Sequence, residues 1–340
     1  MNGGDMVDVR AAREVVDIIT GGWRAQALYA AVKMGLPDHI EAGARSSAEL
    51  AAVTGAEQEG IRRLMRLLVA MGVFAGSESR GYQNTPVSAA VREGPHSLRD
   101  MALLHGEEYY AAWGKAHHAI ASLSSGFEEA YGTSFYAYLS QEPETARRFQ
   151  HTMNSGNMFF DAVPEAFSFA GKHVVDVGGG GGHLLATILS ATPDANGVLL
   201  DREHMLSRAR AHLTAVLGEL DRVNLVAGDM FESVPAGGDV YIYCRVLAGW
   251  EDAAVVRAFK ACYRAMVGDS SRLLVIDRFV VDEGSTVLPA LWDLHLLMTN
   301  GGRHRSRDNF VGLLDRAGFE VERDVQLPME TTALVARPRL

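Results

Sequence analysis

Five consecutive glycines, at positions 178–182, constrain the fold of this chain more than any other feature. They follow an apolar run at 174–177, typical of a buried strand, and precede an apolar run at 184–191, typical of a helix. Open α/β sheets bind ligands at such a turn, because glycines adopt positive φ and let the backbone approach the ligand closely. We therefore expect an α/β domain with a ligand site at this loop.

Short apolar runs alternate with helical patterns through the C-terminal half of the chain, which predicts a doubly wound parallel sheet. Further strands are expected at 197–201, 223–226, 240–243 and 272–277, and helices at 203–217 and 252–266. Two last runs, at 320–325 and 331–335, predict closing strands, with an antiparallel strand at one edge of the sheet.

The N-terminal half is predicted to be mainly helical. Helical periodicity covers 10–45, and helices at 48–53 and 61–71 precede two short strands around a polar tip at 77–80, the order of a winged helix. Residues 1–100 hold 11 Lys and Arg against 12 Asp and Glu, so the basic surface of a DNA-binding protein is missing. A structural or dimerising role is favoured, and a winged-helix transcriptional regulator is the alternative.

Composition narrows the class of protein further. The chain is 340 residues long, 48% hydrophobic and 22% charged, with a net charge of −10, which argues against a disordered chain and against partners such as nucleic acid or an anionic membrane. Two cysteines, Cys244 and Cys262, argue against a disulfide scaffold. We find no signal peptide and no apolar window of about 18 residues, and therefore expect a cytoplasmic protein.

The length predicts more than one domain. We expect a winged-helix dimerisation domain at 1–100, a helical connector at 101–165 and a ligand-binding domain at 166–340. The connector is rich in aromatic side chains, which serve either as core and dimer interface or as the wall of a pocket for a flat apolar substrate.

The spacing of the glycines indicates which cofactor the loop binds. The dinucleotide pattern G-x-G-x-x-G/A fails, because His183 or Leu184 occupies its last position, and no Gly-Lys-Ser/Thr phosphate loop is present. The spacing Asp176-x-Gly178-x-Gly180-x-Gly182 is instead that of enzymes that bind S-adenosylmethionine.

Acidic residues after the next two strands support this interpretation. Asp201 ends the second strand and is expected to accept hydrogen bonds from both ribose hydroxyls. After the third strand come Gly228 and Asp229, whose carboxylate is suited to the adenine amino group. Met230 and Phe231 would then pack against the faces of the base.

With these motifs the chain resembles the bacterial and plant small-molecule O-methyltransferases that use S-adenosylmethionine, above all those acting on aromatic natural products. The resemblance spans nearly the whole chain. It implies a Rossmann-like methyltransferase sheet, a winged-helix dimerisation domain, an intertwined homodimer and an acceptor between the helical part and the sheet. It also implies that Trp250 lies near the adenine and that the Cys244 backbone meets the methionine end of the cofactor.

One departure from the family bears on mechanism. The family pattern is His-Asp/Asn-Trp-x-Asp, with the His as general base, but this chain has Ala248 where that His would stand. Two acids normally flank the His, and in this register they correspond to Asp277 and His304.

Three interpretations follow from the missing base. Methyl transfer can rely on proximity and orientation alone, which supply roughly 7–11 kcal/mol in favourable cases. Alternatively His304 with Asp277 replaces the base from another direction. In the third interpretation the protein is a non-methylating enzyme that retains the cofactor. The missing His raises the odds of a nitrogen or carbon acceptor over an oxygen.

Acceptor-site residues follow only from the register with the family, and each is also compatible with plain core packing. They are Trp113, Met153, Asn157, Phe160, Met298 and Asn300. No metal is expected, because His117, His118, His151 and His295 lack the spacing of metal ligands. The sequence thus predicts transfer of a methyl group from S-adenosylmethionine to an O, N or C atom of an aromatic or polycyclic secondary metabolite.

Overall fold

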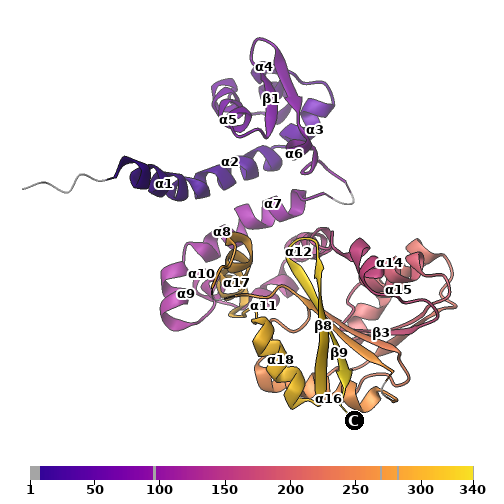
Figure 1. Cartoon of the computed structure of the whole chain (residues 1–340). Coiled ribbons are helices and arrows are strands. Elements are labelled where there is room, and N and C mark those ends of the chain that lie inside the picture. The colour runs from indigo at the N-terminus through magenta and orange to yellow at the C-terminus, as the bar shows by residue number, and fades with distance from the viewer. Residues whose placement is uncertain (1–7, 95–96, 269, 282, 340) are drawn as a thin grey trace, which may run out of the picture. The chain divides into compact units, whose positions relative to one another are not determined.

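The computed structural model describes residues 8–94, 97–268, 270–281 and 283–339. The chain forms two compact units, one of Met1–Gly114 and Tyr136–Gly156 and the other of Lys115–Phe135 and Asn157–Leu340 (Figure 1). Among the described residues, no helix is long and apolar enough to cross a membrane.

The winged helix lies in the first unit, where the sequence places it. Its elements are α1 (Val9–Ile19), α2 (Gly21–Lys33), α3 (Leu36–Glu41), α4 (Ser47–Thr54), α5 (Gln58–Ala70), β1 (Phe74–Ser77), β2 (Gly81–Asn84) and α6 (Pro86–Ala89). Ser46 begins α4 with a capping box, since its side chain accepts from Glu49 N and the Glu49 carboxylate accepts from Ser46 N. Apolar side chains of α5 pack on the hairpin strands β1 and β2 through Met65, Phe74 and Tyr82.

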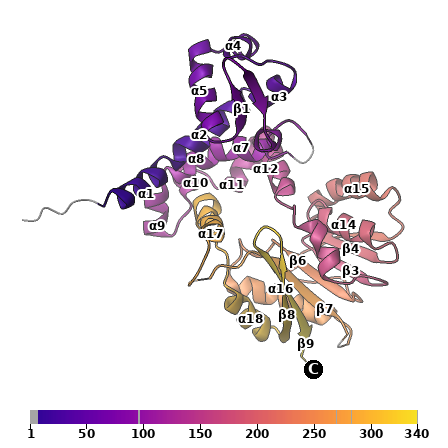
Figure 2. The ribbon, with the colours of Figure 1, turned by 45° about the horizontal axis from the view of Figure 1, so that its top comes forward.

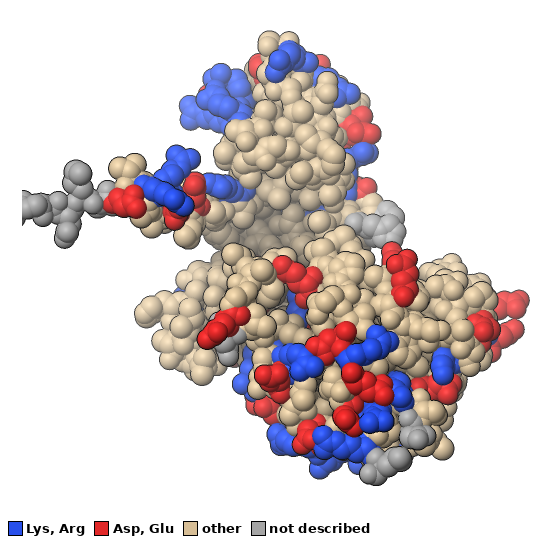
Figure 3. Space-filling model, in the orientation of Figure 1, with Lys and Arg blue, Asp and Glu red and all other residues tan. Residues whose placement is uncertain are grey.

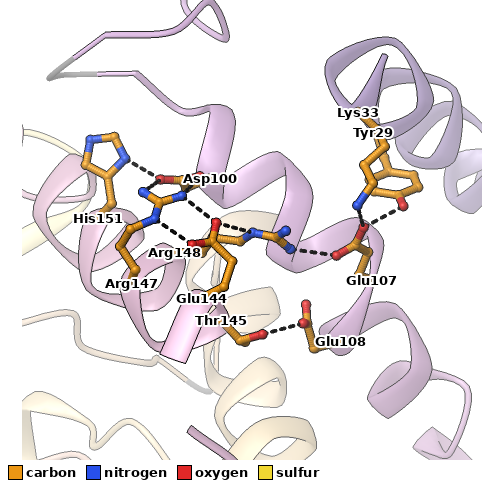
Figure 4. A network of polar contacts seen from close by, with 10 residues as sticks. All are labelled: Tyr29, Lys33, Asp100, Glu107, Glu108, Glu144, Thr145, Arg147, Arg148 and His151. Carbon is orange, nitrogen blue, oxygen red and sulfur yellow. Dashed lines mark hydrogen bonds and ion pairs between the residues drawn. The ribbon is translucent and has the colours of Figure 1, made fainter. Parts of the chain in front are cut away.

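Polar contacts hold three further helices of the first unit, α7 (Arg99–Gly106), α8 (Glu108–Trp113) and α12 (Pro143–Ser155), to one another and to α2 (Figure 4). Asp100 is 5% exposed and accepts hydrogen bonds from Arg147, at 3.1 Å, while its other close neighbour, His151 Nδ1, lies at 2.7 Å. Glu107 accepts from Arg148 of α12 and from Tyr29 and Lys33 of α2.

The second unit is built on a seven-stranded sheet with the order β5-β4-β3-β6-β7-β9-β8. Its strands are β3 (His173–Val177), β4 (Asn196–Asp201), β5 (Val223–Ala227), β6 (Val240–Cys244), β7 (Arg272–Asp277), β8 (Phe319–Leu327) and β9 (Thr331–Pro338). The first five are parallel, which confirms the predicted doubly wound sheet. The antiparallel strand is β9, which lies one position in from the edge strand β8.

Helices cover both faces of this sheet (Figures 1 and 2). One face packs Val175 and Tyr243 against α16 (Asp252–Ala265) and α18 (Arg307–Arg316). The other packs Val174 and Ile242 against α14 (His183–Ala191) and α15 (Glu203–Leu217). The remaining helices of this unit are α9 (Ala116–Ser122), α10 (Gly126–Tyr131), the 3-10 turn η1 (Phe160–Ala162), α13 (Val163–Ala166) and α17 (Val287–Asn300); α11 (Phe135–Gln141) begins at its border with the first unit.

Charged side chains are interleaved on the surface over α18, β8 and β9 (Figure 3). Arg337 pairs with Glu320, Arg307 with Asp324 and Arg272 with Glu322. On α5 of the winged helix, Glu59 accepts hydrogen bonds from both Arg62 and Arg63. Two of the basic side chains that a DNA-binding helix would present to phosphates are therefore already paired within their own helix.

Candidate active site

The glycine run forms the predicted turn between β3 and α14. Gly178 has φ +71°, and its backbone N donates to Leu200 O of the neighbouring strand at 2.8 Å. A Cβ at this position would lie 2.6 Å from Val246 Cγ2, so a side chain would clash as well as strain the backbone. Glycine is therefore required where the loop leaves the sheet.

A pocket with about 470 Å³ of empty space, partly open to solvent, lies at the carboxyl ends of β3, β4, β5 and β6. This is the edge at which parallel α/β sheets bind ligands. Its walls are Gly178, Leu200, Asp201, Arg202, Gly228, Asp229, Met230, Phe231, Val246 and Trp250. The structure thus brings together most of the residues predicted to bind the cofactor. Gly180, Asp176 and Cys244 do not line the pocket directly.

Two carboxylates hold the polar side of the pocket in place. Asp201 Oδ2 accepts from Gly180 N at 2.7 Å, which fastens the glycine loop to the end of β4, and Oδ1 accepts from Arg202 N at 2.7 Å. Asp229 Oδ1 accepts from Phe231 N at 2.9 Å, and Oδ2 lies 3.0 Å from the guanidinium of Arg202. A carboxylate offers about four acceptor sites, so both groups keep capacity for ligand hydroxyl or amino groups.

The opposite side of the pocket is aromatic and apolar. The rings of Phe231 and Trp250 meet edge to face with centroids 4.7 Å apart. Trp250 is 44% exposed, which leaves much of its ring uncovered. Met230 and Val246 extend the same wall. A flat apolar ring with polar substituents at one end matches this combination of walls.

Asp176 lies beneath the loop, at the end of β3. It is 2% exposed, and its Oδ2 has no hydrogen-bond partner among the described residues. Burial, and secondly the nearby Asp201 carboxylate, raise the Asp176 pKa to about 7. A buried carboxylate without a partner is stabilised by a cation, so this position fits a positively charged ligand. Cys244, at the end of β6, has a thiol pKa raised well above its usual range by burial.

The two residues that flank the missing base lie together in the structure. His304 Nδ1 is 3.6 Å from Asp277 Oδ1, which is beyond hydrogen-bond distance. Both side chains are buried, and His304 Nδ1 has no hydrogen-bond partner within the described part of the chain. The backbone N of His304 donates to Asp293 Oδ1 at 2.6 Å.

The segment before His304 packs against the turn that carries Ala248. Arg303 N donates to Ala248 O at 3.4 Å. Buried Arg305 then clamps the turn, because its guanidinium donates to Leu247 O and to the Asp252 carboxylate, each at 2.9 Å. The two chain neighbours of His304, Arg303 and Arg305, therefore contact the turn that carries the base in the family.

The predicted acceptor residues are divided between the two units. Trp113 and Met153 belong to the first unit, and the other four to the second. Asn157 Oδ1 accepts from Arg245 at 2.7 Å. Phe160 packs edge to face on Phe159. Met298 is fully buried, and Asn300 Oδ1 accepts from Gly302 N.

Three residues in or near the candidate site, Arg202, Val246 and Arg278, belong to none of the sequence motifs. Arg202 and Val246 line the pocket, and only their places next to Asp201 and after β6 could have pointed to them. Arg278 is 6% exposed, donates to Met329 O and lies 5.2 Å from the Trp292 ring centroid. Burial, followed by the nearby Arg245, lowers its pKa to about 10. In the part of the chain that the structure describes, no cluster of three His, Cys, Asp or Glu is arranged to hold a metal ion.

Comparison with known proteins gives the family. The profile of the O-methyltransferase dimerisation domain matches residues 16–92, and that of the O-methyltransferase domain matches residues 113–320. A phenazine-1-carboxylate N-methyltransferase of Pseudomonas aeruginosa is 45% identical over 97% of this chain and 98% of its own length. A 3-amino-4-hydroxybenzoate 4-O-methyltransferase of Streptomyces cremeus is 37% identical over 97% of this chain and 91% of its own length.

A solved structure supports the same assignment. That of the pyocyanin biosynthetic protein PhzM superposes with a TM-score of 0.90 at 44% identity, and covers 97% of this chain and 100% of that one. The fold, the position of the pocket and the sequence matches agree. The chain belongs to the O-methyltransferase family that carries an N-terminal dimerisation domain.

Proposed function

We propose that this protein methylates a ring nitrogen of a planar, fused aromatic natural product, and that it acts by positioning the acceptor rather than by removing a proton from it. The protein is a methyltransferase that uses S-adenosylmethionine, as its family does; similar solved structures contain this cofactor or S-adenosyl-L-homocysteine. The observation that carries the proposal is Ala248, a methyl side chain where the family has a base. A pyridine-type nitrogen presents a lone pair and no proton, so its methylation needs no base.

The residues that line the pocket support a proposal for how the ribose and the adenine of the cofactor bind. Asp201 would accept hydrogen bonds from the two ribose hydroxyls, and Asp229 from the adenine amino group, while both keep their present backbone contacts. Met230, Phe231 and Trp250 would enclose the adenine ring. Gly228 follows the end of β5 and packs tightly there, because a Cβ at this position would lie 2.9 Å from Leu200.

The loop side of the pocket would hold the methionine end of the cofactor. Gly178 and Gly180 bring the backbone close, Cys244 contributes its backbone, and the Asp176 carboxylate supplies negative charge beneath the loop. When bound, S-adenosylmethionine supplies a methyl group that is already activated on a positively charged sulfur. The remaining task of the protein is to hold the acceptor atom in line with that methyl group and to exclude water.

On the acceptor side we propose Asn157, Phe160 and Asn300, which all belong to the second unit. Asn157 would orient the acceptor through the side chain that now accepts from Arg245. Met298 supports this region from the core, since it is fully buried. These assignments rest on the register with the family.

The test is a labelling experiment with S-adenosylmethionine carrying a trideuterated methyl group. Phenazine-1-carboxylate is offered in parallel with 3-amino-4-hydroxybenzoate, because similar proteins carry the names of these two acceptors. We expect a labelled product of the phenazine with the label on nitrogen, identified by mass spectrometry and NMR. Label only on oxygen would overturn the nitrogen assignment, and no label on either acceptor or on a wider aromatic panel would count against the proposal as a whole.

A second candidate is O-methylation with His304 as the base, and the apposition of the buried side chains of His304 and Asp277 favours it. Deprotonation of a phenol makes the rate rise with pH, whereas a ring nitrogen above its own pKa gives a flat profile. His304→Ala would then abolish turnover, and Asp277→Asn would shift the pH profile. Near-normal activity of His304→Ala leaves positioning as the mechanism.

We further propose that the protein is a cytoplasmic homodimer. The dimerisation-domain match covers all of α2 and the end of α1, from Val16 to Ile19, and α1 has no buried residue in the single chain. Its apolar residues Val9, Ile18 and Ile19 are all more than half exposed, which is typical of a surface that a partner covers.

A further inference from the structure

Three basic side chains gather beside the glycine loop, outside the pocket described above. They are His183 at the start of α14 and Arg208 and His212 on α15, and none of them lines that pocket. The helices α14 and α15 lie side by side next to β3 and β4 (Figures 1 and 2). The imidazole rings of His183 and His212 are 3.7 Å apart between centroids.

Two members of the cluster, His183 and Arg208, lie close to Gly181. A Cβ on Gly181 would lie 3.1 Å from the His183 ring and 3.8 Å from Arg208 Nε. The guanidinium and the imidazole therefore both lie near the same residue of the glycine loop.

Within the described residues, no acidic side chain pairs with these three basic side chains. Among the residues that the structure describes, none gives the side chains of His183, Arg208 or His212 a hydrogen bond or an ion pair. The charged groups that act on His183 are His212 and Arg208, and Arg208 is the one that acts on His212. Burial first, and these neighbours second, lower the His183 pKa to about 4, and the His212 pKa is lowered for the same reasons.

This environment differs from that of five arginines described above. Arg62, Arg147, Arg272, Arg307 and Arg337 each pair with a carboxylate. The cluster holds one half-buried guanidinium and two imidazoles with unused donors, in a chain whose net charge is −10. The first turn of α14 adds backbone amides with no capping side chain and no acidic residue. An anion would supply the missing charge and accept from all of these donors.

We propose that His183, Arg208 and His212 form a binding site for a doubly charged oxyanion, either inorganic sulfate or phosphate or the phosphate group of a metabolite. The anion accepts hydrogen bonds from Arg208 and from both imidazoles, which take up protons as it binds. The site lies behind the glycine loop and goes beyond the methyltransferase function, so it stands or falls independently of that function.

Sulfate is the first probe, because it keeps its charge of −2 across the pH range of histidine titration. Calorimetry on the cofactor-free protein, with sodium chloride at equal ionic strength as the reference, should show saturable sulfate binding. A bound anion favours the charged imidazole, so it raises the histidine pKa, and affinity must rise as pH falls. We expect sulfate to raise the pKa of His183 in histidine NMR spectra from about 4 to about 6.5, and therefore to bind about tenfold more tightly at pH 5.5 than at pH 8.

Arg210 provides a matched control, since it is an exposed arginine two residues along the same helix. Arg208→Gln should weaken sulfate binding at least tenfold, and Arg210→Gln should leave it within twofold. His183→Asn and His212→Asn should each reduce the pH dependence, with melting curves confirming that the variants are folded.

Phenyl phosphate, a phosphate monoester, distinguishes the two sources of anion. Tighter binding than sulfate indicates the phosphate group of a metabolite, and equal binding indicates a free oxyanion. Absence of saturable binding, equal losses in the two arginine variants, or displacement of sulfate by S-adenosyl-L-homocysteine would each overturn an independent site at this cluster.

Discussion

Asp201 joins the glycine loop to the pocket, and its substitution gives the most direct test of the cofactor site. Asp201→Ala removes the acceptor for Gly180 N and the proposed acceptor for the ribose. Each hydrogen bond to a charged group contributes about 1.5–3 kcal/mol, so we expect cofactor affinity to fall at least tenfold by calorimetry. Glu203→Ala removes an exposed carboxylate two residues away and should leave affinity unchanged. An unaltered dissociation constant for Asp201→Ala would contradict the ribose assignment.

The Asp176 carboxylate is predicted to destabilise the cofactor-free protein and to favour binding of the positively charged cofactor. Its pKa of about 7 in the folded protein lies above that of an unfolded aspartate, so folding favours the protonated form. The contribution to stability is full below about pH 4, and is lost as pH rises through 7, where the folded protein must bury an unpaired charge. Asp176→Asn should therefore raise the melting temperature of the cofactor-free protein at pH 8 more than at pH 5.

The same variant should weaken S-adenosylmethionine binding, because an amide carries no negative charge toward a cationic ligand. Asp176→Asn is thus expected to raise stability and to lower cofactor affinity. This combination is specific to a carboxylate that binds a ligand. A variant that is destabilised at pH 8 would show that the Asp176 carboxylate is paired in the free protein.

At the scale of elements, the sequence predicts regular pieces well and their interruptions poorly. The strand before the glycine loop and helix α14 lie within one residue of the predicted bounds, because apolar periodicity there is undisturbed. The region 101–165 is predicted only as helical, and it divides into several short helices. One break lies at Leu123, whose φ of +51° is unusual for leucine and could not be read from its residue type.

In the candidate site, too, some residues could be predicted from the sequence and others could not. Asp201 and Asp229 were predicted because strand ends in a parallel sheet converge at one edge. Arg202, Val246 and Arg278 depend on where a side chain turns after its strand, which tertiary packing decides. The apposition of His304 and Asp277 joins segments far apart in the chain, and only the register with the family pointed to it.

The polar network between α7 and α12 yields a prediction at this scale (Figure 4). Asp100→Ala leaves Arg147 and His151 without their buried acceptor, and we expect a loss of roughly 1–3 kcal/mol in unfolding free energy. Glu144→Ala, in the same network but with its side chain 61% exposed, should cost under about 1 kcal/mol. Urea denaturation measures both, and equal losses would show that burial does not set the strength of this network.

At the scale of the whole molecule, the exposed apolar face of α1 should decide the oligomeric state. Ile18 is 79% exposed in the single chain, so a charge there costs little in a monomer. In a dimer that covers this face, Ile18→Glu would bury an unpaired carboxylate. Light scattering after size exclusion should show a dimer for the wild-type protein and at least a tenfold weaker dimer for the variant.

Arg10→Glu serves as the control, because it places the same side chain at a site on α1 whose arginine is 87% exposed. It should leave the dimer intact. Equal dissociation of the two variants would indicate a general charge effect instead of a specific apolar contact. A wild-type monomer would mean that the exposed residues of α1 have another partner. An intertwined dimer makes folding and association one event, so the melting temperature of the wild-type protein should also rise with its concentration.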